Sequence, residues 1–311
     1  MEKLFKLKEN GTDVKTEIIA GLTTFLAMAY ILIVNPSMLA TAGMDQNAVL
    51  LATALSAAIA TLCMAFFANY PVALASGMGL NAYFTYTVCL GMGVSWKVAL
   101  TAILVEGLIF IVLSLFKFRE TLVNSIPANL KFGITAGIGL FISIVGLKGA
   151  GVVVDNESTL VDLGKMSNPE VVLALVGLLL IGIMWHFKVK GAILWGILAT
   201  WILGIIAQLT GWYTGASLIP DFSNWTLLPH VEESTFFQFD FSWIGQNVLS
   251  FCVIVFSFLF VDIFDTVGTL VGVASKGGLL DKDGKLPRAG GALMADAVGT
   301  VVGACLGTST V

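Results

Sequence analysis

Long apolar runs dominate the chain, and polar residues gather in the short stretches between them. A helix needs about 20 mostly apolar residues to cross a hydrocarbon core roughly 30 Å thick. On this pattern the 311 residues contain ten predicted membrane segments. Their approximate ranges are 17–40, 47–68, 71–90, 97–116, 131–148, 169–186, 190–210, 247–275, 287–304 and a last one that begins at 305. We therefore expect an all-α polytopic membrane protein.

The composition supports a membrane location. The chain is 57% hydrophobic and only 12% charged, whereas soluble domains are about 25% charged. A soluble chain of this length has too little interior to hide so much apolar surface. The net charge of -4 argues against nucleic-acid binding, which needs a basic face. Because the four cysteines and two histidines lack metal-ligand spacing, we expect no metal and no other cofactor.

Lysine and arginine predict the orientation, since they accumulate in cytoplasmic loops. With the N-terminus inside, all but three of the 16 Lys and Arg residues fall in cytoplasmic stretches; the exceptions are Lys97, Lys148 and Lys165. The polar stretch 211–246 contains neither Lys nor Arg and would lie outside. The charged N-terminus shows no cleavable signal peptide. The sequence thus predicts a multi-pass protein of the cytoplasmic membrane with a cytoplasmic N-terminus.

Two apolar stretches are interrupted by glycine or proline, "ANYPVALASGMGLNAYFTYTV" (68–88) and "GACLGTSTV" (303–311). Unwound backbone at membrane depth is tolerated only where protein or a water-filled cavity surrounds it. Paired interruptions in two halves of a chain indicate an inverted-repeat transporter with its site at the breaks. Segments 1–7 would form one repeat and segments 8–10 would open a second, inverted one. Because the last apolar stretch stops at Val311, we expect the natural protein to be longer.

Two carboxylates lie three positions apart in the apolar run "FLFVDIFDTVGTL" (258–270). Asp262 and Asp265 share one helix face, and each costs a few kcal/mol at membrane depth. One interpretation is structural, with hydrogen bonds to neighbouring helices or to the hydroxyls of Thr266 and Thr269. The functional interpretation is a substrate acceptor and proton carrier, because a low dielectric favours the protonated acid. We assign Asp265 to the ligand and Asp262 to its support.

Three further polar residues fall inside membrane segments. Asn81 both donates and accepts hydrogen bonds, which suits a heteroaromatic ring, and the neighbouring Gly79 would let the backbone approach a ligand. The alternative is that such glycines permit tight helix packing. Glu106 and Asp296 belong either to a proton path or to polar contacts between helices, and we favour the structural role.

Four motifs resemble those of the AzgA-like purine permeases of the nucleobase–ascorbate transporter superfamily. They are "NGTDVKTEIIAGLTTFLAMAYILIVNP", "ASGMGLNAYF", "FLFVDIFDTVGTL" and "ADAVGTVVGACLGTSTV". The resemblance implies 14 membrane segments in two inverted seven-segment repeats. Segments 1–4 and 8–11 would form a core domain and the others a gate, with a short strand and a half-helix in segments 3 and 10. Members import adenine, guanine or hypoxanthine together with a proton.

The resemblance also implies roles for particular residues. Substrate binding falls on Asp265, Asn81, Gly79, Thr269 and Thr308, whereas Asp262, Asp296 and Glu106 would serve proton coupling or support. The family's second acidic binding residue follows the "GTSTV" motif and would lie beyond Val311. Residues 1–130 correspond to the first core segments, 131–246 to the gate and 247–311 to the start of the second core. The expected partners are a purine nucleobase, the lipid bilayer and a second copy in a homodimer.

Other functions compete with purine transport. A permease of the same fold could carry uracil, xanthine or an anion, although an anion site needs a cation or a bare helix N-terminus, which an aspartate opposes. An intramembrane aspartyl protease also uses two membrane carboxylates. That enzyme requires aspartates on two facing helices, one of them in a GxGD motif, and the chain contains no GxGD. A channel would more naturally line its pore with symmetric charges.

Overall fold

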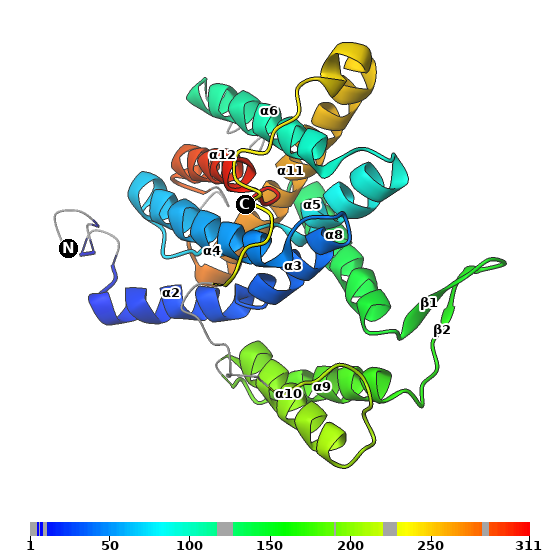
Figure 1. The fold of residues 1–311 in the computed structure, drawn as a ribbon. Helices are drawn as coiled ribbons and strands as arrows, with labels where there is room; N and C mark the ends of the chain where they lie inside the picture. Colours follow the sequence, from blue (N-terminus) through cyan, green and yellow to red (C-terminus); the bar gives the residue numbers. More distant parts are fainter. Residues whose placement is uncertain are drawn as a thin grey trace. The chain divides into compact units, whose positions relative to one another are not determined.

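A computed structural model describes residues 5, 7–8, 11–116, 127–189, 191–219, 229–281 and 286–311. The chain divides into two compact units. The larger comprises Met1–Ile138 with Pro229–Val311, and the smaller comprises Gly139–Leu228. Figure 1 shows their helices along the chain.

The larger unit is built from helices around α12 (Ala289–Leu306). α12 lies between α4 (Gln46–Cys63) and α6 (Trp96–Leu115) (Figure 1). The other elements of this unit are α2 (Val14–Met28), α3 (Ile31–Ala40), the π-helical η1 (Met64–Ala68), α5 (Met78–Ala82), the π-helical η2 (Tyr83–Gly91), the 3-10 turn η3 (Trp243–Gln246) and α11 (Val248–Gly277). η1 continues α4, and η2 continues α5.

Seven helices are long and apolar enough to cross a membrane in the part of the chain that the structure describes. They are Val14–Ala40, Gln46–Ala68, Trp96–Leu115, Pro169–His186, Ala192–Leu209, Val248–Ser275 and Ala289–Leu306. Each coincides with a predicted segment, and the predicted segment 131–148 falls within α8 (Ala128–Gly149). The prediction of a helical polytopic membrane protein is confirmed.

Local sequence explains where several helices begin and end. The carboxylates of Asp13 and Asp45 cap α2 and α4, accepting hydrogen bonds from the amides of Thr16 (2.8 Å) and Ala48 (2.6 Å). Such caps satisfy amide groups that have no partner inside the helix. α12 ends at Gly307, whose φ of 90° lies in the left-handed region that glycine tolerates. The chain therefore leaves the helix immediately before the stretch "TSTV".

The break in the third segment comprises residues 69–77, which follow η1 without regular secondary structure and lead into α5. Asn69 opens it in the left-handed region, with φ of 54°. α12 continues to Leu306, two residues beyond the predicted end at 304. The resemblance implies a short strand in segment 3 and another in segment 10. The described residues 69–77 and 308–311 form no β ladder with each other, and a hydrogen bond between the hydroxyls of Ser76 and Ser309 joins them instead.

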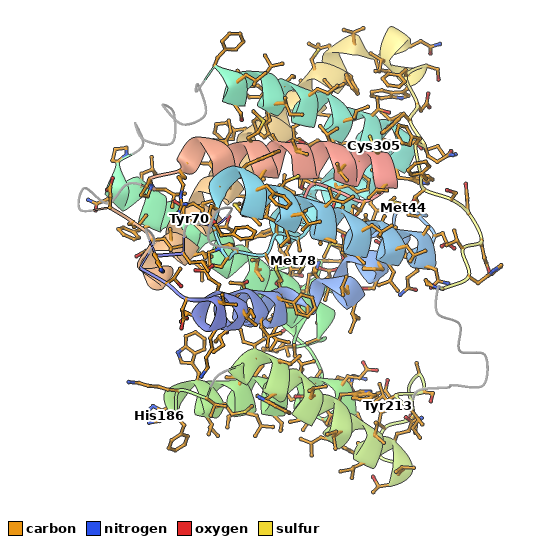
Figure 2. The ribbon with its side chains drawn as sticks, turned by 90° about the vertical axis from the view of Figure 1, so that its left-hand side faces the viewer. Met44, Tyr70, Met78, His186, Tyr213 and Cys305 are labelled. Atoms are coloured by element: carbon orange, nitrogen blue, oxygen red, sulfur yellow. The ribbon has the colours of Figure 1, made fainter. Side chains whose placement is uncertain are left out.

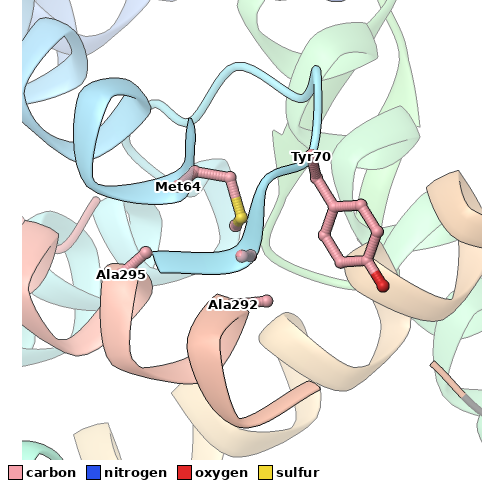
Figure 3. Packing of buried hydrophobic residues seen from close by; sticks show 5 residues of the cluster. Met64, Tyr70, Ala292 and Ala295 are labelled. Carbon is pink, nitrogen blue, oxygen red and sulfur yellow. The ribbon is translucent and has the colours of Figure 1, made fainter. Parts of the chain in front are cut away.

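Small residues allow α12 to approach η1 closely. Met64, Ala68, Tyr70, Ala292 and Ala295 form a buried cluster (Figure 3). Next to it, Gly291 lies against the backbone carbonyl of Phe67, so that any side chain at 291 would overlap that oxygen. Close backbone approach through glycine and alanine is typical of helix contacts in membranes. This contact fixes the start of the extended segment relative to α12.

The smaller unit contains a hairpin that the sequence pattern did not predict. β1 (Val153–Asn156) pairs antiparallel with β2 (Leu160–Leu163), Val153 lying opposite Leu163. α9 (Pro169–His186) and α10 (Ala192–Leu209) follow and pack together. The strands are only four residues long, too short for alternation to stand out between long apolar runs.

Candidate functional site

The two interrupted segments meet through side chains. Ser76, near the end of the first break, lies 2.7 Å from the hydroxyl of Ser309 and donates to the carbonyl of Thr310 (2.7 Å). The amide oxygen of Asn81 accepts a hydrogen bond from Ser309 and lies 2.9 Å from the Ser76 hydroxyl, whose single proton can go to either this oxygen or the Thr310 carbonyl. All four residues are buried. Because Ser309 and Asn81 are 228 positions apart, these contacts fix the geometry where the segments cross.

A second polar cluster holds the same stretch from the other side. The amide nitrogen of Asn35 in α3 donates to Thr53 of α4 and to Thr308, both at 2.8 Å. The hydroxyls of Thr53 and Thr308 are themselves 3.2 Å apart. All three residues are buried. The Asn35 amide oxygen has no hydrogen-bond partner among the described residues, so the cluster is held through the amide nitrogen and the two hydroxyls. Hydrogen bonds in a low-dielectric interior favour one arrangement of the chain, and this cluster therefore positions residues 308–311.

The loop 229–242 ties down the end of α12 at which the second break begins. The amide of Phe237 donates to the backbone carbonyl of Cys305 (2.8 Å). The hydroxyl of Thr235 donates to the backbone carbonyl of Leu306 (3.2 Å). Asp240 accepts hydrogen bonds from the hydroxyl and the amide of Ser242. These bonds lower the pKa of the Asp240 carboxyl. The loop therefore stays ordered by its own contacts next to Gly307.

A cavity of about 230 Å³ lies beside this crossing. It is somewhat smaller than pockets for drug-sized ligands, which span about 300–1,000 Å³, and thus suits a small molecule. Its lining residues come from α2, η1, the first break, α5, α11, α12 and the end of the chain. They are Met28, Met64, Val72, Ala73, Leu74, Ala75, Gly77, Leu80, Asp262, Asp265, Thr266, Thr269, Leu270, Val273, Asp296, Thr310 and Val311.

In the view of Figure 2, Met78, the first residue of α5, lies between Tyr70 on one side and Met44 and Cys305 on the other. The preceding residue, Gly77, lines the cavity.

Asp265 lies directly against the start of the half-helix. A Cβ atom placed on Gly77 would come within 2.6 Å of the Asp265 carboxylate oxygen Oδ2. A side chain at this position would therefore displace the carboxylate. Gly77 precedes the first turn of a helix that runs on through η2, and the positive end of a helix dipole favours an anion there. The start of α5 and the missing side chain of Gly77 together position the Asp265 carboxylate at the cavity.

A hydroxyl bridges the two other carboxylates of the cavity. Thr266 Oγ1 lies 3.3 Å from Asp262 Oδ1 and 3.2 Å from Asp296 Oδ2. A hydroxyl has a single proton to donate but also accepts. The Thr266 hydroxyl can therefore donate to one carboxylate and accept a hydrogen bond from the other side chain when that side chain is a protonated carboxylic acid. The arrangement joins α11 to α12 and provides a place for one proton.

The structure brings together some of the sequence-predicted site residues and separates others. Asp262, Asp265, Thr269 and Asp296 all line the cavity. Four others do not appear in its lining: Gly79, Asn81, Glu106 and Thr308. Asn81 and Thr308 belong instead to the two polar clusters that hold the crossing. Glu106 is wholly buried in α6, next to Gly107, which contacts Thr300 and Val301 of α12.

Sequence reasoning missed Thr310 and Ser76. Both are hydroxyl residues adjoining glycine-containing stretches, but a single serine or threonine in an apolar run carries little signal because it usually bonds within its own helix. Thr310 lines the cavity and Ser76 links the two breaks. Their importance follows from the non-helical backbone at both positions: the Ser76 hydroxyl bonds to another segment, and the Thr310 carbonyl accepts from it.

A larger cavity of about 630 Å³ shares one wall with the first. The extended residues Val72–Ala75 line both. The larger cavity is bounded mainly by apolar side chains of α2, α3 and α4, with Glu17, Thr61 and Tyr70 as its polar residues. The smaller cavity, with three aspartates and three threonines, has the polar groups that recognise a ligand. We therefore assign the candidate site to the smaller cavity.

The cavity lining carries one sign of charge. Its described residues include three aspartates and no Lys, Arg or His. Carboxylates accept strong hydrogen bonds from N–H donors, whereas an anionic ligand would be repelled. The geometry thus favours a neutral or cationic ligand with N–H groups.

The fold and the site define the class of protein first. A polytopic helical membrane protein with a polar cavity where two interrupted segments cross is a transporter. A family model described as "Permease family" matches residues 15–311, and the chain belongs to that family.

Three relatives illustrate the similarity. MJ0326 of Methanocaldococcus jannaschii is 51% identical over 311 residues, covering 100% of this chain and 69% of the relative. The Bacillus subtilis guanine/hypoxanthine permease PbuO is 45% identical, covering 98% and 69%. The Escherichia coli adenine permease AdeP is 42% identical, covering 100% and 67%. The resemblance to AzgA-like purine permeases is confirmed, and the chain is a transporter, not an enzyme.

Proposed function

We propose that this protein imports purine nucleobases across the cytoplasmic membrane together with protons. The observation that carries the proposal is the carboxylate-lined cavity at the crossing of the two breaks. Relatives named as adenine and as guanine/hypoxanthine permeases support a purine as the substrate. A neutral purine offers N–H donors, which match carboxylate acceptors, and the absence of basic side chains from the described lining disfavours an anion.

In this proposal Asp265 is the main substrate acceptor. Its carboxylate faces the cavity beside Gly77, and Thr269 supports the same turn of α11 by donating to the Asp265 carbonyl (2.8 Å). Asn81 keeps its amide nitrogen without a hydrogen-bond partner among the described residues. That donor is available to the substrate if the half-helix shifts during transport. Gly79 would let the first turn approach the ring, and Thr308 would act by positioning the second break.

The coupling proton would reside on the pair formed by Asp262 and Asp296. A hydroxyl shared by two carboxylates is best satisfied when one of the acids is protonated, and Thr266 occupies that position. A protonated pair also lowers the net charge of the cavity. The loaded protein therefore changes between its inward-open and outward-open states more easily than an empty protein with a charged cavity. Glu106, buried away from this cavity, would support the packing of α6.

The transport cycle would move a core domain against a gate. The core would include residues 1–130 and 247–311, and the gate residues 131–246. The separate compact unit Gly139–Leu228 supports such a division. We further propose two inverted seven-segment repeats, 14 membrane segments in all, a cytoplasmic N-terminus and a homodimer. The interrupted segments, one in each half, support the inverted repeat.

The test is uptake of radiolabelled hypoxanthine, guanine and adenine by cells that lack purine permeases and express this protein. Saturable uptake should be faster at about pH 6 than at about pH 8 and should collapse with an uncoupler, because protonation precedes transport. Asp265→Asn should lose more than about tenfold in uptake, since a charge-assisted acceptor becomes a neutral amide. Asp155→Asn, on the exposed hairpin, is the control and should transport normally.

Two results would contradict this proposal, one for the substrate and one for the coupling to protons. If the protein reaches the membrane but none of the three purines is taken up, purine import is wrong. Uracil, xanthine and anions would then be tested. If uptake occurs but is independent of pH and of the uncoupler, purine transport stands and proton coupling is wrong.

A further inference from the structure

Most hydroxyl groups that line the cavity are already engaged. Thr266 Oγ1 lies between two carboxylates, and Thr269 Oγ1 donates to the backbone of its own helix. Thr310 differs, because its Oγ1 has no hydrogen-bond partner among the described residues. The residue is only 1% exposed. A buried hydroxyl in the cavity wall is thus left to interact with whatever fills the cavity.

A buried hydroxyl without a partner is uncommon, because losing water without replacement is costly. Thr85 and Thr300 also have unpartnered Oγ1 atoms, but both lie within helices, where a small rotation brings the hydroxyl to a carbonyl one turn earlier. Thr310 lies in the non-helical stretch after Gly307 and has no helical turn directly before it. Its backbone carbonyl is held by Ser76 at 2.7 Å, so the position of the residue is fixed. The ligand is the natural partner for this hydroxyl.

The chemistry of a purine adds a second reason. Its edges carry ring nitrogens that accept hydrogen bonds beside N–H groups that donate them. The ionised carboxylates of the cavity only accept. Of the described lining residues with side-chain donors, Thr310 alone has a hydroxyl whose proton is not already directed to another group. Thr310 can supply the donor that a ring nitrogen in the cavity requires.

We propose that Thr310 is a substrate-contacting, specificity-determining residue whose hydroxyl donates to an unprotonated ring nitrogen of the nucleobase. This inference rests on the proposed function, since it assumes a nucleobase in the cavity. Asp265 accepts from the N–H edge, and Thr310 fixes which way round the ring lies. A site built to hydrogen-bond a polar atom rejects an analogue that lacks this atom, because the protein group is then left buried without a partner.

The experiment measures competition against purine uptake by the parent base and by its deaza analogues, in which one ring nitrogen is replaced by CH. In the wild type, one deaza analogue should bind about tenfold more weakly than the parent, the effect of one lost hydrogen bond. In Thr310→Val, the parent base should bind about tenfold more weakly and that analogue should no longer differ from it. Thr310→Ser keeps the hydroxyl and should keep the discrimination. Thr300→Val is the matched control and should change neither value.

The outcomes separate this inference from the proposed function. If wild-type protein in the membrane takes up no nucleobase, the proposed function fails. If the wild type transports and Thr310→Val keeps the wild-type affinity and analogue profile, only the role of Thr310 is overturned. Equal weakening of the parent and all analogues would also overturn it, because a structural defect has no preference for one ring position. Should Thr310→Val fail to reach the membrane, Thr310→Ala replaces it in the comparison with Thr310→Ser.

Discussion

α12 and α9 are both predicted membrane helices of 18 residues, yet their surroundings differ. α12 has the lower mean hydropathy, 1.5 against 1.9, but 56% of it is buried within its unit, against 11% of α9. α12 is made largely of Ala and Gly and carries Asp296, whereas α9 is dominated by Leu, Val and Ile. In a membrane, apolarity indicates contact with lipid, and small or polar residues indicate contact with protein.

α6 shows the limit of this rule. It is the most apolar of the seven helices, with a hydropathy of 2.6, and is as deeply buried as α12. What α6 shares with α12 is a glycine at their contact, where Gly107 lies against Thr300 and Val301. α9 and α10 also meet through glycines, Gly177 against Thr200 and Gly196 against Ile181. A glycine at a helix contact therefore indicates a closely packed face, but it does not by itself identify the helices of the site.

The largest predicted effect is on stability, when a glycine of α12 is replaced by alanine and compared with the same replacement in α9. Gly291→Ala in α12 should cost about 1–3 kcal/mol or more, because its Cβ overlaps the backbone carbonyl of Phe67, which cannot move aside as a side chain can. Gly182→Ala in α9, with nothing within 4 Å, should be neutral or stabilising by up to about 1 kcal/mol. Thermal unfolding in detergent measures both. Equal shifts would contradict the distinction between the two helices.

A second substitution tests the contact between the half-helix and the carboxylate. Gly77→Ala should raise the KM for purine more than about tenfold, since its Cβ would displace Asp265 Oδ2 and weaken a charge-assisted hydrogen bond. Gly79→Ala has free space, so a raised KM there would indicate that the base approaches the backbone. Uptake kinetics at matched membrane abundance measure both. An unchanged KM in Gly77→Ala would contradict the placement of Asp265 at the substrate.

A smaller effect is expected from the cluster that positions the second break. Thr308→Val removes an acceptor of the Asn35 amide, which still keeps Thr53. We expect a loss of about 1 kcal/mol in stability and little change in the KM. Asn47→Ala, which removes a hydrogen bond to the loop carbonyl of His230 at an exposed position, is the comparison and should cost less. A raised KM with unchanged stability would instead identify Thr308 as a direct substrate ligand.

The smallest effect should come from the surface. Glu233 lies 3.9 Å from Lys97, and both side chains are partly exposed. Such pairs contribute about 0–1 kcal/mol, so Glu233→Gln should shift thermal unfolding no more than its neighbour Glu232→Gln does. A clear difference between the two variants, lost at high salt, would show that the ion pair holds the loop 229–242 in place.

Much of the site could be predicted because its chemistry is local in sequence. Asp262 and Asp265 stand out by charge in an apolar run, and both line the cavity. Asp296 also lines it, although the sequence favoured a structural role for it. The place of Thr310 in the cavity lining could not be predicted, because a threonine in an apolar stretch is common and only the tertiary structure distinguishes this one. The hairpin β1–β2 was not predicted because its short strands show too little alternation of apolar and polar residues.

The sequence by itself determined the approximate bounds of the seven described spans, each of which coincides with one of the ten predicted segments, and the presence of two breaks. These depend on apolar length, glycine and charge along the chain, which are local properties. Only the tertiary structure decided that Ser76, Asn81 and Ser309 meet, that Asn35 is held by Thr53 and Thr308, and that Gly77 faces Asp265. Such contacts join residues up to 273 positions apart. They arise from helix packing and from the satisfaction of buried polar groups, which no local pattern encodes.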